Sequence, residues 1–166
     1  MPAPRTILNK KLARQIAALP WRTLPDGGLE FLLVTSRSSG RWLIPKGWPI
    51  PGKGPARSAQ QEAFEEAGIK GKISSKPLGD YNYLKLLHDG EQLPCVVHVF
   101  GLRHVNLLDE WPEQGQRERR WFKPEEAAAA VFEAGLSEFL SNVAIKVRKA
   151  DRAWDEQHAA AGLAAR

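Results

Sequence analysis

Three glutamates stand close together near the middle of the chain, and their spacing could serve metal chemistry. They lie in the run "PARSAQQEAFEEAG", where Pro55 can begin a helix and Gly68 can end it in a left-handed cap. Each helical residue advances by about 100°, so Glu62, Glu65 and Glu66 share one face. Carboxylates at these spacings repel one another, which favours a bound divalent cation such as Mg²⁺. A solvated acidic surface is the alternative that the spacing alone leaves open.

A loop rich in glycine and proline leads into the predicted helix. Residues 47–54 contain five of these residues, too many for a helix or a strand, so a loop of defined shape is predicted. Such a loop can bring backbone N–H groups, and Lys46 or Lys53, to a phosphate that the cation also contacts. The loop and the helix together therefore favour a metal and phosphate site over a solvated surface.

Residues 47–69 resemble the Nudix box of the Nudix hydrolases. The family pattern is Gly, five residues, Glu, seven residues, Arg-Glu, an aliphatic, any residue, Glu-Glu, any residue, Gly and an aliphatic. Gly47 takes the first position and "EAFEEAGI" supplies the end without a gap, with Ala63 in the aliphatic position. The resemblance implies Mg²⁺ or Mn²⁺ as cofactor. It also implies that the metal-binding residues are Gly47, Glu62, Glu65 and Glu66, of which the three glutamates are catalytic.

Two positions of the box depart from the family pattern. Lys53 stands where the pattern has its first Glu, and Gln61 stands where it has Arg. Gln61 can still donate hydrogen bonds but brings no charge. The metal carboxylates are therefore retained while two supporting charges have changed, and Gln61→Arg is predicted to leave activity equal or higher.

The resemblance extends beyond the box, to roughly residues 20–140. "LLVTSRSSGRWLIPKG" and "DEWPEQGQRERRWFKPEEAAAAV" look like parts of the diphosphoinositol polyphosphate and diadenosine polyphosphate phosphohydrolase branch, which use such segments to hold polyphosphate. Arginine suits this role because its planar fork binds two phosphate oxygens at once. For each arginine, a salt bridge at a strand edge is the alternative. The resemblance implies the following substrate-binding residues: Arg37, Ser38, Ser39, Arg41, Lys46, Gly47, Arg117, Arg119 and Arg120.

The implied reaction is metal-dependent hydrolysis of a phosphoanhydride bond in a nucleoside- or inositol-linked diphosphate or polyphosphate, by attack of water on phosphorus. The general base is left open among Glu62, Glu66 and Glu113. A module that senses a nucleotide or an inositol phosphate without catalysis is the alternative, and Lys53 and Gln61 support it. Trimming of RNA 5′ ends would need a more continuous basic surface, so the expected partner is a phosphorylated small molecule rather than a nucleic acid.

The elements around the box predict an α+β fold. Strands are predicted at 29–37, through "SSGRWLIP", at 72–87, at 93–105 and at "RERRWF", with further helices from Pro124 and after Gly135. This order indicates a mixed sheet rather than a regular βαβ array. The resemblance implies the Nudix fold, an α/β/α sandwich with a mixed sheet between helices.

Composition predicts one domain with extended ends. The chain has 166 residues, 43% of them hydrophobic, and a net charge of +5 that is not gathered in one run. We expect a solvated basic arm over 1–18, the Nudix domain over 19–150 and a fraying helical tail over 151–166. The only cysteine, Cys95, is expected to be buried. No apolar stretch approaches the roughly 20 residues of a membrane span, so a cytoplasmic monomer or homodimer is expected.

Overall fold

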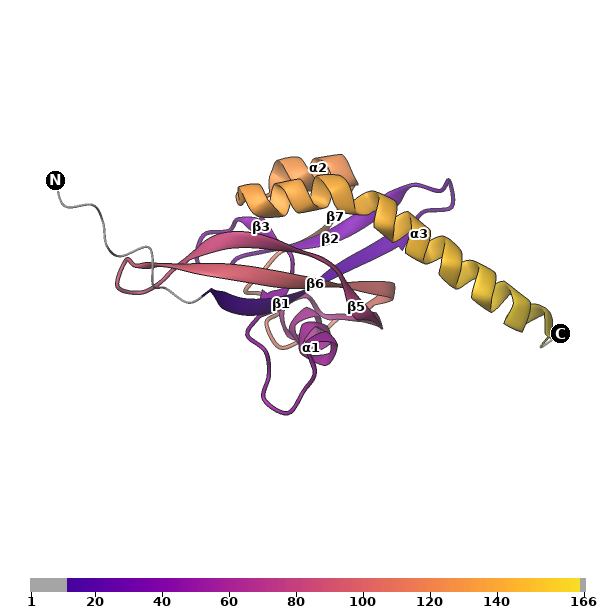
Figure 1. Cartoon of the computed structure of the whole chain (residues 1–166), viewed down its shortest axis with the longest axis horizontal. Coiled ribbons are helices and arrows are strands. Elements are labelled where there is room, and N and C mark those ends of the chain that lie inside the picture. The colour runs from indigo at the N-terminus through magenta and orange to yellow at the C-terminus, as the bar shows by residue number, and fades with distance from the viewer. Residues whose placement is uncertain (1–11, 165–166) are drawn as a thin grey trace.

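The apolar stretches of the chain form a seven-stranded sheet whose two faces are covered by helices (Figure 1). The computed structural model describes residues 12–164. In Figure 1, α2 and α3 lie over one face and α1 lies under the other. This arrangement confirms the predicted α+β fold with a mixed sheet between helices. The elements are β1 (Ala13–Thr23), β2 (Leu29–Thr35), β3 (Trp42–Leu43), β4 (Lys46–Gly47), α1 (Pro55–Ala67), β5 (Ile69–Leu86), β6 (Gln92–Leu107), β7 (Arg119–Phe122), α2 (Pro124–Ala130) and α3 (Ala134–Ala164).

The sheet is mixed because β1 runs parallel to β6. Its strand order is β3-β2-β1-β6-β5, with β4 paired to β1 and β7 paired to β2. The parallel register runs from Ala13 opposite Cys95 to Pro20 opposite Leu102. Residues 15–21 of β1 are buried without a break, as expected of a central strand that is covered on both faces.

The boundary of the predicted N-terminal arm is wrong. Residues 13–18, assigned to a solvated arm, belong to β1, and Ile16, Ala17 and Ala18 are at most 2% exposed. Two features concealed this strand in the sequence. Basic residues surround the apolar run, and alanine has little intrinsic preference for strands. Residues 1–11 lie outside the described part of the chain.

Helix α1 begins and ends as the sequence predicts. Pro55 is its first residue, and Gly68 follows it in the left-handed conformation, with φ of 63° and its N–H bonded to the Phe64 carbonyl. Ala59, Ala63 and Ala67 are fully buried against the sheet, where they pack with apolar residues of β1, β2 and β6. Small side chains on this face let the helix lie close to the strands, which fixes the direction of its remaining faces.

Helix α3 seals the opposite face of the sheet and continues beyond it (Figure 1). Its buried residues Leu136, Leu140, Val143 and Val147 join the larger core cluster. Past residue 150 it remains helical to Ala164, and Asp151 accepts a hydrogen bond from the Trp21 indole at 2.9 Å. Among the helices of this described segment, none combines the length and hydropathy needed to cross a membrane.

Candidate active site

A cleft of about 490 Å³ lies where β4, α1 and the segment before β7 meet. Its walls carry two carboxylates and four cations, a combination that suits an anionic ligand bound together with a metal. A hollow of about 850 Å³ between β1, β6 and α3 is larger but lies away from the three glutamates, so size does not identify the site. The cleft is lined by Gln15, Ser36, Arg37, Ser38, Leu43, Lys46, Gly47, Trp48, Glu62, Glu66, Lys85 and Arg117.

Glu66 is the most deeply buried acid of the cleft, with 6% of its surface exposed. Its Oε2 accepts a hydrogen bond from the Lys46 backbone N–H at 3.3 Å, and its Oε1 lies 3.5 Å from Arg117 Nη2. Burial raises the pKa of Glu66 to about 8, and this effect outweighs the opposing charge of Arg117. The carboxylate is therefore held in place but remains short of positive charge.

Glu62 lies against the backbone of β4. A β-carbon on residue 47 would come within 2.9 Å of Glu62 Oε2 and closer still to Oε1, so any side chain there would displace the Glu62 carboxylate. Burial, followed by repulsion from Glu65 and Glu113, raises the pKa of Glu62 to about 7. The spacing of the helix therefore brings Glu62 and Glu66 together in the cleft, beside Gly47.

Glu65 points to the side of this pair. Its Oε1 accepts a hydrogen bond of 2.7 Å from the Gln61 side-chain amide, and the Gln61 oxygen accepts one of 3.2 Å from Lys53 Nζ. Within residues 12–164, no three acidic, imidazole or thiol side chains are already arranged around a common metal position. The structure thus places two of the three predicted metal glutamates, Glu62 and Glu66, in the cleft lining, whereas Glu65 is hydrogen-bonded to Gln61.

The cleft residues nevertheless fit a divalent cation. Mg²⁺ is commonly held by one or two carboxylates and completes its octahedron with waters and substrate phosphates. Glu62 and Glu66 supply two such carboxylates, and Gly47 lies directly beside Glu62. Burial raises the pKa of both acids, and the nearby charge of Arg117 offsets this effect only in part, so a bound cation would favour their ionised forms.

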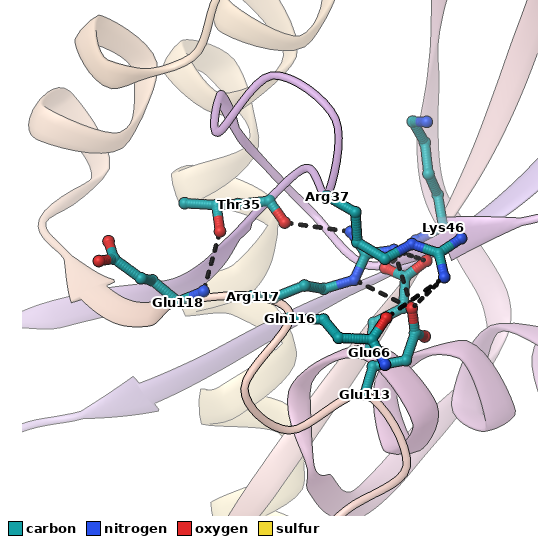
Figure 2. Close-up of polar contacts among 8 residues, drawn as sticks. All are labelled: Thr35, Arg37, Lys46, Glu66, Glu113, Gln116, Arg117 and Glu118. Atoms are coloured by element: carbon teal, nitrogen blue, oxygen red, sulfur yellow. Dashed lines mark hydrogen bonds and ion pairs between the residues drawn. The ribbon is translucent and has the colours of Figure 1, made fainter.

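A network of arginines and carboxylates closes the side of the cleft (Figure 2). Arg117, nearly buried, donates from Nε and Nη2 to Glu113 Oε1 and from Nη1 to the Thr35 carbonyl. Arg37 Nη1 lies 3.4 Å from the same Glu113 oxygen. The Glu113 backbone N–H also bonds to the carbonyl of Glu65 at 3.0 Å. The segment before β7 is therefore fastened both to α1 and to the end of β2.

Comparison with known proteins identifies the family. Residues 13–143 match the family described as the NUDIX domain. The chain belongs to the Nudix family. It is 33% identical over 119 residues to Nudix hydrolase 12, mitochondrial, of Arabidopsis thaliana, covering 68% of this chain and 59% of the relative. It is 35% identical over 101 residues to diphosphoinositol polyphosphate phosphohydrolase 3-beta of Bos taurus, covering 59% of this chain and 57% of that protein. These comparisons confirm the resemblance and its branch, although the chain spans less than two thirds of either relative.

Solved structures support the Nudix fold. The structure of C. elegans Ap4A hydrolase superposes with a TM-score of 0.60, at 19% identity, covering 82% of this chain and 99% of that one. The NUDIX domain of Shewanella oneidensis NrtR, solved with ADP ribose, gives a TM-score of 0.61 at 11% identity, covering 83% of this chain and 90% of that one. At these identities the likeness concerns the fold alone.

Five of the nine residues predicted to bind substrate line the cleft of this Nudix protein: Arg37, Ser38, Lys46, Gly47 and Arg117. The other four lie outside its lining. Ser39 bonds to Ser36 within the turn after β2. Arg41 stacks on the Phe132 ring at 3.5 Å, and Arg120 lies 5.1 Å from the centre of the Trp42 ring.

Arg119 is hydrogen-bonded to backbone carbonyls. Its guanidinium donates to the carbonyls of Ala67, Gly68 and Leu108, with distances of 2.8, 3.3 and 2.8 Å. It also lies 4.0 Å from the centre of the Trp111 ring. The guanidinium thus satisfies the carbonyls at the end of α1, which the helix itself leaves without partners. Sequence reasoning treated neighbouring arginines alike, but alternate residues of a strand face opposite sides.

The structure also adds cleft residues that sequence reasoning did not name. Lys85 reaches the cleft from β5 and Gln15 from β1. Both come from long strands without a motif: the pairing of β1 with β4 brings Gln15 beside the box, and Lys85 follows because β5 and β1 both flank β6. Lys46 lies with its ammonium 4.8 Å from the centre of the Tyr83 ring, and burial lowers its pKa while Glu133 opposes the shift.

Proposed function

We propose that the protein is a metal-dependent hydrolase that cleaves a phosphoanhydride bond in a nucleoside- or inositol-linked diphosphate or polyphosphate. The observation that carries the proposal is the cleft itself, in which Glu62 and Glu66 lie among Arg37, Lys46, Lys85 and Arg117. The names of the relatives support the substrate class. Mg²⁺ or Mn²⁺ would be held by Glu62, Glu66 and the Gly47 carbonyl, with Glu65 beside them.

The cations of the cleft divide into two groups that suit different parts of a substrate. Arg37 and Arg117 lie together beside Glu113, and each has a planar fork that can grip a terminal phosphate. Lys46 and Lys85 lie on the strand side and contribute point charges. A chain of two or more phosphates could therefore lie along the cleft and contact both groups.

In the proposed reaction, a water oxygen attacks phosphorus, the bridging P–O bond breaks, and the water proton passes to a carboxylate. When bound, the metal supplies neutralisation of the charge on the phosphoryl oxygens. Glu62, Glu66 and Glu113 are the acids near enough to the cleft to accept the proton.

A phosphate-release screen tests this function. The substrates are diadenosine polyphosphates, nucleoside diphosphate derivatives and inositol pyrophosphates, each with Mg²⁺ or Mn²⁺. We expect turnover on at least one class and a loss of roughly 100-fold or more in Glu66→Gln. Glu65→Gln is compared beside it, and Glu156→Gln, on the exposed far part of α3, is the control. Metal binding without turnover on any class would instead identify a sensing module for such ligands.

The predicted cytoplasmic location stays a prediction. Two of the relatives, from Arabidopsis thaliana, are named as mitochondrial proteins. Fractionation of cells that express the full chain, followed by detection in cytosol and organelles, would test it.

A further inference from the structure

Lys53 and Gln61, the two altered positions of the box, contact each other, and Gln61 also contacts Glu65. Lys53 Nζ donates to Gln61 Oε1 at 3.2 Å, and Gln61 Nε2 donates to Glu65 Oε1 at 2.7 Å. The three side chains therefore form one directed chain of hydrogen bonds from the loop to α1. Among residues 12–164, only Oε1 of the Glu65 carboxylate accepts a hydrogen bond, which leaves the second oxygen of this carboxylate for another ligand.

The two ends of a side-chain amide differ in hydrogen bonding, so its orientation depends on whether each neighbour donates or accepts. One end of the Gln61 side chain can only accept hydrogen bonds and the other can only donate them. Lys53 can only donate, so it turns the amide oxygen toward itself and the amide N–H groups toward Glu65. A carboxylate at residue 53 would compete with Glu65 for the same N–H groups and would favour the opposite orientation.

The family pattern satisfies these three positions in another way. It places an acid at position 53 and Arg at position 61. The arginine then has N–H groups to donate both to the acid at position 53 and to the glutamate at position 65. In this chain the residue at position 61 is the neutral Gln61, and the positive charge lies on Lys53 instead. We propose that Lys53 and Gln61 are positioning residues that act together to orient Glu65 for metal binding, in place of the acid and Arg of the pattern. This inference rests on the proposed function.

The loop is built to keep Lys53 in reach of Gln61. The Lys53 N–H bonds to the Ile50 carbonyl in a tight turn, at 3.0 Å. The Ile50 N–H in turn bonds to the hydroxyl of Ser58, a fully buried residue in the first turn of α1, also at 3.0 Å. The backbone that carries Lys53 is thus fastened to the helix that carries its partners.

The test changes the charges at residues 53 and 61 and measures the Mn²⁺ dissociation constant of each variant. The measurement uses electron paramagnetic resonance without substrate. Lys53→Glu should raise the Mn²⁺ dissociation constant by roughly three- to tenfold. Adding Gln61→Arg to that variant should restore the constant to within about twofold of the wild type, because arginine donates on both sides. Gln61→Arg alone should change little, since the exposed Lys53 can turn away into water.

Two controls separate this effect from others. Lys70→Glu makes the same charge change in the same surface hollow as Lys53. Because Lys70 lies near the Phe64 ring and not on Gln61, this variant should leave the Mn²⁺ dissociation constant unchanged. In a Glu65→Gln background, Lys53→Glu should lose its effect. Melting temperatures of all variants show whether each is folded.

Equal constants for Lys53→Glu and Lys70→Glu, or failure of Gln61→Arg to rescue a folded Lys53→Glu variant, would overturn the inference. Failure of the proposed function is distinguishable, because a protein without turnover still reports its Mn²⁺ affinity. If the wild type turns over substrate, kcat should follow the same order as the affinities. If it binds no Mn²⁺, both proposals are wrong.

Discussion

Arg117 holds a single oxygen of Glu113 with two of its N–H donors, Nε at 3.3 Å and Nη2 at 3.2 Å. Arg37 approaches the same oxygen at 3.4 Å. The Glu113 carboxylate therefore engages two donors of Arg117 and lies close to one nitrogen of Arg37. Under the proposed function, Glu113 would compete with a substrate phosphate for these two arginines.

Glu113→Gln should consequently strengthen substrate binding. We expect KM to fall by roughly threefold or more, with kcat within about threefold of the wild type, because both arginines lose their competing anion. Steady-state kinetics checks this, with Glu110→Gln on the same segment as the control. A fall in kcat of about 100-fold would instead make Glu113 the general base.

Gly47→Ala should damage the metal site. The added β-carbon would overlap the Glu62 carboxylate and displace it. We expect Mn²⁺ affinity and kcat/KM to fall by roughly tenfold or more, with the fold retained. Gly54→Ala is the matched control, because a β-carbon there meets open space. Equal affinity in the two variants would show that Glu62 can move without loss.

Arg119→Met should lower stability rather than substrate affinity. The change provides an apolar side chain of similar length but removes the donors to the carbonyls of Ala67 and Gly68 at the end of α1 and to the carbonyl of Leu108. Urea unfolding should show a loss of about 1–3 kcal/mol. Arg120→Met, on the opposite face of β7, should cost less. If Arg119→Met instead raised KM at unchanged stability, the substrate role predicted from the sequence would be right.

The metal-free protein should become less stable as the pH rises. Glu62 and Glu66 have pKa values of about 7 and 8 in the folded chain, above the ordinary 4.5, so the folded state binds more protons than the unfolded state between about pH 5 and 8. The unfolding free energy therefore falls across that window. Mg²⁺ needs both acids ionised, so its stabilising effect should be small near pH 5.5 and larger near pH 8.5. Melting temperatures with and without Mg²⁺ check this, and a Glu62→Gln, Glu66→Gln double variant should flatten both trends.

The sequence predicted the local part of the site well. Pro55 and Gly68 are local helix signals, and the spacing of Glu62 and Glu66 fixes which face they share whatever the helix packs against. The confirmed helix boundaries and the meeting of these two acids in the cleft follow from that. Glu65 is hydrogen-bonded to Gln61, which Lys53 reaches from the preceding loop, and these contacts could not be predicted from helical spacing alone.

The parts that the sequence did not predict depend on contacts between distant segments. Arg119 donates to the Ala67 carbonyl at the end of α1 only because the pairing of β7 with β2 brings it there. Lys85 joins the cleft only because β5 and β1 both flank β6. The residues of β1 looked like a solvated arm until the strand that pairs with them was known.

The position of β1 also constrains how the chain can fold during synthesis. A β1–β2 hairpin can form early, since Trp21 pairs with Phe31 close by in the sequence. The other edge of β1 has no partner until β6 leaves the ribosome, because Ala13 pairs with Cys95 and Pro20 with Leu102. The nascent chain must therefore carry an apolar strand with an open edge until β6 has been synthesised, and such an edge favours aggregation.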